Sequence, residues 1–308
     1  MTRVAVLGCG AMGSIYAALL AAAGHEVVCI SRNQNHVDAI NRRGLRVSGA
    51  SGDRTVQVKA VTQIPNEKFE VLVISLKAAD IPFVSAAKQM LYEQSIIVTL
   101  QNGLGSAEMV AELLGKDQLI VGIAQGFGAS LAGPGHSHHN GMKAIRLGAF
   151  EVNQDTNVAA AARLFTAAGF DTELSHDITA VQWEKLICNV AYSGPCALTG
   201  MTVGEMMDDP IMGEVSRAAA VEAFDIAKLR GIKLSFTDPI AYVRDFAASM
   251  PAAKPSVLLD IEAGRRSEIT VINGAVPREA AKVSATAPVN ATITALVQAM
   301  EVKFSAPT

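Results

Sequence analysis

The sequence predicts a doubly wound α/β domain over residues 1–175 and an all-α domain over residues 176–308. In the first half, short apolar runs alternate with helical stretches, which is the order expected of a parallel sheet covered by helices. From about residue 180 the apolar residues recur at helical spacing instead. The helices expected there cover residues 181–191, 213–230, 238–248, 256–263 and 267–285.

The chain opens with a strand, a glycine-rich turn and a helix. Residues 4–13 read VAVLGCGAMG, an alanine-rich stretch follows, and residues 25–30 form the next expected strand. In this context Gly8 permits the tight turn, Gly10 lets the backbone approach a pyrophosphate, and Gly13 lets the helix pack closely on the strand. The helix N-terminus offers N–H groups to the phosphates. The motif therefore predicts a Rossmann-type dinucleotide site formed by Gly8, Cys9, Gly10, Ala11, Met12 and Gly13.

The residues after the second strand select the dinucleotide. NAD sites place an Asp or Glu at this point to bind the ribose hydroxyls. This chain has Ser31 and Arg32 instead, and a guanidinium suits a 2′-phosphate. We therefore expect NADPH/NADP+ as the cofactor, with a solvated loop arginine as the alternative interpretation of Arg32.

Further elements complete the α/β domain. Strands are expected over residues 71–76, 96–100 and 119–122, helices over 80–91 and 106–114, and a short hairpin from 45–47 and 56–60. Turn residues between positions 133 and 148 predict a hairpin at the sheet edge, closed by a strand over 144–147. The histidines there, His136, His138 and His139, have no carboxylate or cysteine nearby in sequence, so we expect no metal site.

Composition excludes several classes of partner. The 308 residues are half hydrophobic and carry a formal charge of −3, which provides no basic surface for nucleic acid or for an anionic membrane. No run approaches the roughly 20 apolar residues of a membrane span, and the flanks of a signal peptide are missing. We expect a cytoplasmic monomer or homodimer that acts on a small molecule. Its four cysteines form no C-x-x-C pair and are expected to be free thiols.

Polar groups that interrupt the helical second half are candidates for chemistry. Lys185 and Asn189 are four residues apart and share a helix face. A partly buried lysine beside a nicotinamide can protonate a carbonyl oxygen that receives hydride, whereas a surface lysine paired with Glu184 is the alternative. Ser256 begins an expected helix and suits a carboxylate, although a capping residue would look the same. Glu268 is expected to open the last long helix, where by itself it is an acid that complements the helix dipole.

Motifs from both halves, taken in order, resemble the ketopantoate reductase (2-dehydropantoate 2-reductase) family. The resemblance covers nearly the whole chain. It implies a Rossmann-type domain followed by an all-α C-terminal domain, NADPH as cofactor, and reduction of 2-dehydropantoate to (R)-pantoate in pantothenate biosynthesis. The matching motifs are the N-terminal fingerprint with Arg32, residues 75–77 (SLK), 101–103 (QNG), 134–136 (PGH), 183–186 (WEKL) with Asn189, 256–260, and 268–269 (EI) with 273–274 (NG).

The resemblance also implies roles for single residues. Lys185 would be the general acid, Asn189 and Glu268 would bind the substrate hydroxyl, and Ser256 would take its carboxylate. Lys77 and Asn102 would lie along the cofactor.

Two departures concern the substrate. Ser193 stands where family members often carry a second Asn, so we expect it in the substrate site. Residues 256–260 read SVLLD where the family often reads Ser-Met-x-Gln-Asp, which places Val257 and Leu259 at changed positions. Reduction of a different 2-oxo acid therefore stays open.

Two further functions are alternatives. One is a β-hydroxyacid dehydrogenase-like enzyme, which also uses a catalytic lysine. The other is a binding protein that senses NADPH without turnover. The presence of Lys185, Ser256 and Glu268 together argues against a sensor, which needs neither an acid nor a carboxylate site.

Overall fold

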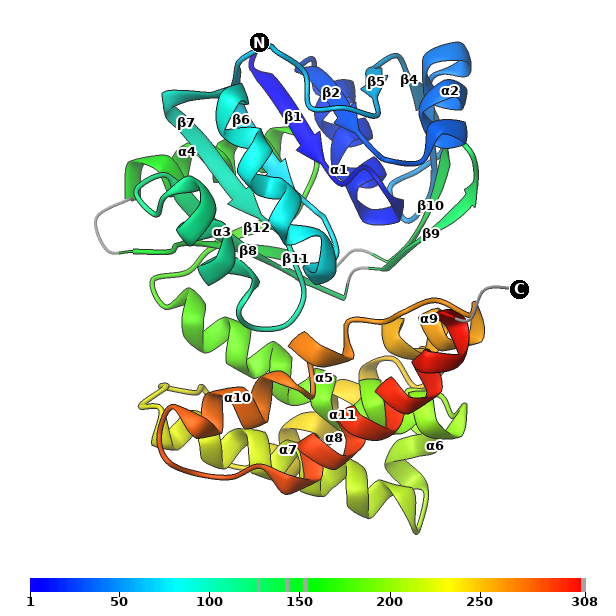
Figure 1. Cartoon of the computed structure of the whole chain (residues 1–308), viewed down its shortest axis with the longest axis vertical. Coiled ribbons are helices and arrows are strands. Elements are labelled where there is room, and N and C mark those ends of the chain that lie inside the picture. Colours follow the sequence, from blue (N-terminus) through cyan, green and yellow to red (C-terminus); the bar gives the residue numbers. More distant parts are fainter. Residues whose placement is uncertain (127, 142–143, 152–154, 306–308) are drawn as a thin grey trace. The chain divides into compact units, whose positions relative to one another are not determined.

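The computed structural model describes residues 1–126, 128–141, 144–151 and 155–305 (Figure 1). The chain divides into two compact units. Unit 1 consists of Met1–Gln101 and Ser106–Ile178, and unit 2 of Asn102–Gly105 and Thr179–Thr308. Unit 1 is α/β and unit 2 is helical, which confirms the predicted fold class. None of the helices in the described ranges is long and apolar enough to cross a membrane.

An eight-stranded sheet forms the centre of unit 1 in the described part of the chain. All neighbouring strands pair in parallel except β11 and β8, which are antiparallel. Figure 1 shows β1, β6 and β7 side by side. The strands in spatial order are β12 (Thr172–Leu174), β11 (Ala144–Ala149), β8 (Leu119–Gln125), β7 (Leu91–Thr99), β6 (Phe69–Ile74), β1 (Arg3–Leu7), β2 (Glu26–Ile30) and β5 (Lys59–Val61).

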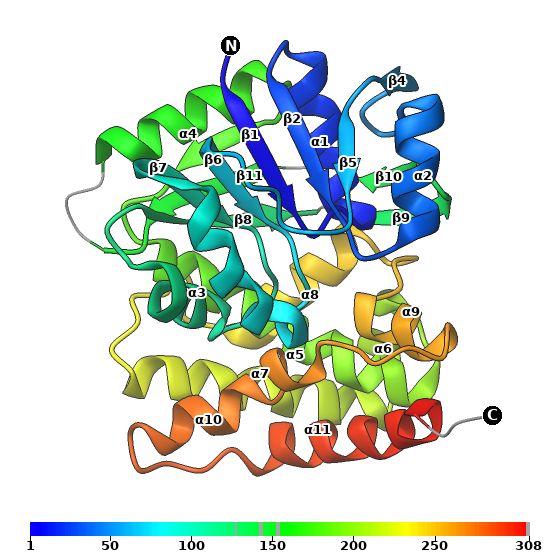
Figure 2. The same ribbon diagram turned by 45° about the horizontal axis from the view of Figure 1, so that its top comes forward.

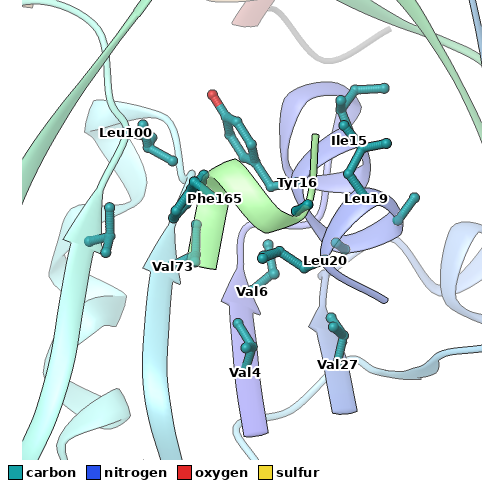
Figure 3. Packing of buried hydrophobic residues seen from close by; sticks show 14 of the residues in the cluster. Val4, Val6, Ile15, Tyr16, Leu19, Leu20, Val27, Val73, Leu100 and Phe165 are labelled. Carbon is teal, nitrogen blue, oxygen red and sulfur yellow. The ribbon is translucent and has the colours of Figure 1, made fainter. Parts of the chain in front are cut away.

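Helices cover both faces of this sheet, because successive strand residues point to opposite sides. In β1, Val4 and Val6 belong to the apolar cluster that includes α1 (Ala11–Ala22) and α4 (Asp155–Ala167). Figure 3 shows Tyr16 and Leu20 of α1 over these strands, with Phe165 of α4 among them. The alternate β1 residues pack in a second cluster with helix η1 (Ala78–Met90) and α3 (Ser106–Leu114). The element order places one further helix, α2 (Gln34–Arg43), after β2.

Helix η1 differs from the α-helix predicted over residues 80–91. It is a 3-10 helix that begins at Ala78 and contains Pro82. Proline has no N–H for an α-helical hydrogen bond to the residue four before it, which disfavours regular α-helix here.

A second sheet corrects two hairpin predictions. Its order is β4 (Arg54–Val56), β3 (Leu45–Gly49), β10 (His136–Gly141) and β9 (Gly128–Gly133). The hairpin predicted from 45–47 and 56–60 pairs only through β3 and β4, since Lys59–Val61 leaves to join β2 in the main sheet. The hairpin predicted between residues 133 and 148 does not form at the edge of the main sheet. Strands β9 and β10 belong to the second sheet instead, and β11, the expected closing strand, lies between β8 and β12 in the main sheet. A pattern of apolar residues predicts that a segment is a strand, but it does not indicate which sheet the strand joins.

Unit 2 is organised around α5 (Ile178–Thr199), which is buried along most of its length. Pro195 inside α5 leaves the Ala191 carbonyl without its helical donor, and the Ser216 hydroxyl donates to that oxygen at 2.6 Å. Helices α7, α10 and α11 pack together (Figure 2). The remaining elements are α6 (Val203–Asp208), α7 (Met212–Leu229), α8 (Pro239–Ser249), α9 (Ser256–Glu262), η2 (Ile269–Val271), α10 (Ala275–Ala281), α11 (Pro288–Glu301) and η3 (Val302–Ser305).

The helix predicted over residues 267–285 is wrong. That stretch holds the short 3-10 helix η2 and the two-turn helix α10, and the last long helix is α11. Pro277 falls in the first turn of α10, where its missing N–H is tolerated, so the α-helix begins shortly before it. Glu268 consequently precedes η2 and does not open a long helix.

Candidate active site

The three fingerprint glycines of unit 1 meet three different steric conditions. Gly8 has φ +95°, and a Cβ there would lie 2.6 Å from the backbone nitrogen of Leu76. A Cβ at Gly13 would lie 2.2 Å from the Gly8 carbonyl oxygen, so helix and strand approach too closely for a side chain. At Gly10 a Cβ would meet no atom within 4 Å, which leaves space for a ligand. No side chain caps the start of α1, so its N–H groups face that space without a competing protein acceptor from a cap.

A buried hydrogen-bond chain supports the loop from behind. The Gly135 N–H donates to His36 Nδ1 at 3.0 Å, so a neutral His36 carries its proton on Nε2. His36 Nε2 lies 3.2 Å from the Ser14 hydroxyl, which lies 3.6 Å from Cys9 Sγ. Cys9 is fully buried, and a hydrogen bond from the Cys29 thiol lowers its pKa. The Cys9 N–H already donates to the Ile30 carbonyl at 2.9 Å, whereas Ala11 and Met12 are partly exposed.

Arg32 follows β2 and is held by two side chains of η1. Its guanidinium lies 2.6 Å from an Asp80 carboxylate oxygen and 5.1 Å from the centroid of the Phe83 ring. The arginine side chain is 64% exposed, so it can still meet a ligand. Ser31 beside it is partly exposed, and Lys77 is the exposed residue that precedes η1. Sequence reasoning missed Asp80, which lies 48 positions from Arg32 in the chain.

Lys185 is the centre of a polar group inside unit 2. Its Nζ donates to Asn102 Oδ1 at 2.9 Å, although the two residues are 83 positions apart. Burial lowers the Lys185 pKa to about 8 from its ordinary value of 10.5, while the negative charge of Glu268 acts in the opposite direction. The alternative of a surface lysine paired with Glu184 is not what the structure shows, since Glu184 is buried and accepts the Ser235 N–H at 2.7 Å.

Asn102 reaches Lys185 because its segment joins unit 2. The Leu104 N–H donates to the Val271 carbonyl at 3.0 Å, and Arg278 donates to the Leu104 carbonyl at 2.7 Å. Gly103 has φ +77°, and a Cβ there would lie 2.0 Å from the Val271 oxygen. Only glycine permits this close approach, so Gly103 is part of the geometry that presents Asn102.

The segment that carries Glu268 is anchored at both ends. The Ser267 N–H donates to Glu301 of α11 at 2.8 Å. At the other end, buried Asn273 donates to the Val190 carbonyl of α5 at 3.0 Å and to Asn290 at 2.9 Å. These anchors connect Glu268 to the helix that carries Lys185. In the sequence, Asn273 stands within an otherwise apolar stretch over residues 271–276, and this pattern was recognised only as part of a family motif.

The other predicted substrate residues lie on α5 and α9. Asn189 is partly buried one helical turn beyond Lys185, and Ser193 is 4% exposed one turn further. Ser256 is exposed at the start of α9, whereas Val257 is fully buried in the helical core and Leu259 is 42% exposed.

The histidine cluster hydrogen-bonds to a serine of β3 and to a serine of the turn after it. His136 and His138 both hydrogen-bond to Ser48, at 2.8 and 3.1 Å, and His139 hydrogen-bonds to Ser51 at 3.1 Å. Across the described residues, no group of three or more His, Cys, Asp or Glu side chains is arranged to hold a metal ion. All four cysteines are free and buried.

Comparison with known proteins identifies the family. The sequence model described as "Ketopantoate reductase PanE/ApbA" matches residues 4–152, and its C-terminal counterpart matches residues 177–301. The 2-dehydropantoate 2-reductase of Pyrococcus horikoshii is 30% identical over 299 residues, 97% of each chain. The crystal structure of a PanE/ApbA family ketopantoate reductase from Ralstonia eutropha JMP134 has a TM-score of 0.89 at 31% identity and covers 99% of this chain and 100% of that one.

A structure of D-mandelate dehydrogenase shares the fold with a TM-score of 0.91 at 21% identity, covering 99% of this chain and 100% of its own. At that identity the likeness concerns the fold alone. The two family matches together span most of the sequence and include both structural units. The chain belongs to the ketopantoate reductase family of oxidoreductases.

Proposed function

We propose that this chain catalyses the NADPH-dependent reduction of 2-dehydropantoate to (R)-pantoate. The observation that carries the proposal is the polar group of unit 2, in which the amine of Lys185 lies beside Asn102 and Glu268 and has its pKa lowered to about 8. Relatives named 2-dehydropantoate 2-reductase support the substrate. The reaction belongs to the biosynthesis of pantothenate.

Lys185 acts as the general acid in this proposal. A carbonyl oxygen gains negative charge as its carbon is reduced, and a positioned ammonium stabilises that charge and transfers a proton to it. A pKa of about 8 keeps the amine mostly protonated near neutral pH and makes it a stronger acid than an ordinary lysine. After the transfer, the neutral amine takes a proton from solvent.

Asn102 and Glu268 prepare this acid in different ways. Asn102 accepts one of the three ammonium N–H groups at 2.9 Å and so fixes the direction of the flexible side chain. Glu268 favours the protonated amine against the effect of burial. We assign Asn189 and Glu268 to the substrate hydroxyl and Ser256 to its carboxylate, as the family resemblance implies.

The glycine loop of unit 1 fits a dinucleotide. The open space at Gly10 and the uncapped N-terminus of α1 form a cradle for a pyrophosphate. Ser31 and Arg32 would meet the adenosine ribose and its 2′-phosphate, and Lys77 and Asn102 would lie further along the cofactor. When bound, NADPH supplies the hydride that becomes the new C–H bond of the product.

A second candidate substrate is another 2-oxo acid. The buried Ser193 has a shorter side chain than the asparagine that family members often carry, and the exposed Leu259 is apolar where the family often has Gln. Both changes favour a less polar acid without altering the proton-transfer group.

The test is oxidation of NADPH, followed by its absorbance, with 2-dehydropantoate and a panel of other 2-oxo acids. A higher kcat/KM with 2-dehydropantoate than with any other acid of the panel supports the proposal. A higher kcat/KM with a bulkier acid would instead support the second candidate substrate. Lys185→Met should bind NADPH as the wild type does but lose turnover by about 100-fold or more. NADPH binding without turnover of any acid would instead support a sensor.

A further inference from the structure

The partner of Arg32 bears on which dinucleotide this chain accepts. The Arg32 guanidinium, expected to receive a 2′-phosphate, is already 2.6 Å from the Asp80 carboxylate. Asp80 and Phe83 are three residues apart in a 3-10 helix, where residues at that spacing project in the same direction. Both side chains therefore approach Arg32 together, the carboxylate at its edge and the ring at its face.

This arrangement is unfavourable for a 2′-phosphate. The phosphate carries between one and two negative charges near neutral pH. It would either share the guanidinium with an adjacent carboxylate of the same sign or displace that carboxylate and break its ion pair. Asp80 is 23% exposed and Arg32 64% exposed, so solvent weakens this repulsion without removing it.

The same carboxylate is favourable for NADH. A free ribose 2′-hydroxyl donates hydrogen bonds, and in NAD sites its acceptor is an acid at the end of the second strand. Here Ser31 and Arg32 follow that strand, but η1 places an acid at the side of Arg32. The acceptor that the sequence lacks at the strand end is thus present in the folded unit.

We propose that Asp80 is a specificity-determining residue that opposes Arg32, reduces the preference for NADPH and allows this chain to use NADH as well. The inference rests on the proposed dinucleotide site. It concerns unit 1 only, because Arg32, Asp80 and Phe83 all belong to that unit.

The experiment measures the dissociation constants of NADPH and NADH by calorimetry for the wild type and for Asp80→Asn, which keeps the shape and removes the charge. The ratio of the NADH constant to the NADPH constant should rise about tenfold, equivalent to about 1.4 kcal/mol. Most of the change should come from tighter NADPH binding. Asp80→Glu keeps the charge and should stay near the wild-type ratio.

Asp53→Asn is the matched control. Asp53 also lies 2.6 Å from an arginine, Arg46, but in the second sheet, so this variant loses an ion pair of the same length elsewhere. It should leave both dissociation constants unchanged. A similar shift in Asp53→Asn would show a general charge effect and refute the assignment.

Three outcomes distinguish a failure of the role assigned to Asp80 from a failure of the proposed dinucleotide site. An unchanged ratio in Asp80→Asn, with NADPH still bound, refutes the role of Asp80 alone. Weaker NADPH binding in Asp80→Asn also refutes it, because Asp80 would then serve to position Arg32. If the wild type binds neither dinucleotide, the cofactor site itself is wrong and the inference falls with it.

Discussion

The pH dependence of the reaction tests the general-acid role of Lys185. The structure lowers the pKa of this amine from 10.5 to about 8, chiefly through burial. Such a group is about 90% protonated at pH 7 and about 10% at pH 9. Since only the protonated amine can donate, kcat should be level below about pH 8 and fall about tenfold per pH unit above it.

Glu268→Gln perturbs this profile in a defined direction. The negative charge of Glu268 raises the Lys185 pKa, so its removal leaves the effect of burial unopposed. The decline in kcat should therefore begin below the wild-type value of about 8. Because Glu268 is also assigned to the substrate hydroxyl, KM should rise as well, and the position of the decline is the informative quantity.

The assay is the initial rate of NADPH oxidation at saturating substrate from about pH 6 to about pH 10, repeated with NADPH deuterated at the transferred position. An isotope effect on kcat would show that hydride transfer limits the rate. A wild-type profile that stays level to pH 10 would refute Lys185 as the acid. A decline that moves to higher pH in Glu268→Gln would refute the electrostatic role of Glu268.

Three other predictions concern the same elements. Lys185→Met should raise the free energy of unfolding at pH 7 by up to about 3 kcal/mol in urea denaturation, because a lysine whose pKa is lowered on folding destabilises the folded state below that pKa. This gain in stability should shrink as pH rises from about 8 to 10.5. A variant less stable than the wild type would contradict the prediction. Arg32→Glu should weaken NADPH binding by roughly 10- to 100-fold and NADH binding much less, whereas equal losses would exclude a 2′-phosphate contact at Arg32. Gly103→Ala should lower the free energy of unfolding by roughly 3 kcal/mol or more, because the new Cβ would collide with the Val271 carbonyl. Gly115→Ala, also at positive φ but in open space, should lower it by about 1 kcal/mol. Equal losses of stability in thermal unfolding would refute the role of close approach at Gly103.

Sequence patterns were sufficient where a local rule decides the structure. The glycine fingerprint required a turn, a close approach and a tight helix contact at three named positions, and Gly8, Gly10 and Gly13 meet those steric conditions. The helical spacing of the second half likewise indicated α5, α7 and α8. It failed over residues 267–285, because the apolar spacing continued through Gly274 and Pro277 while the backbone hydrogen bonds did not.

The partners of the site residues were a matter of tertiary structure. Nothing local to Lys185 indicates that Asn102, 83 residues away, accepts its hydrogen bond, or that its pKa falls to about 8. The same holds for the approach of Asp80 to Arg32. Amino-acid types and spacing by themselves determined the fold class and predicted the glycine loop, and the resemblance to a family singled out Lys185 as the candidate acid. Burial and charge around that acid and around Arg32 depend on residues distant in the chain, so only the folded units decided them.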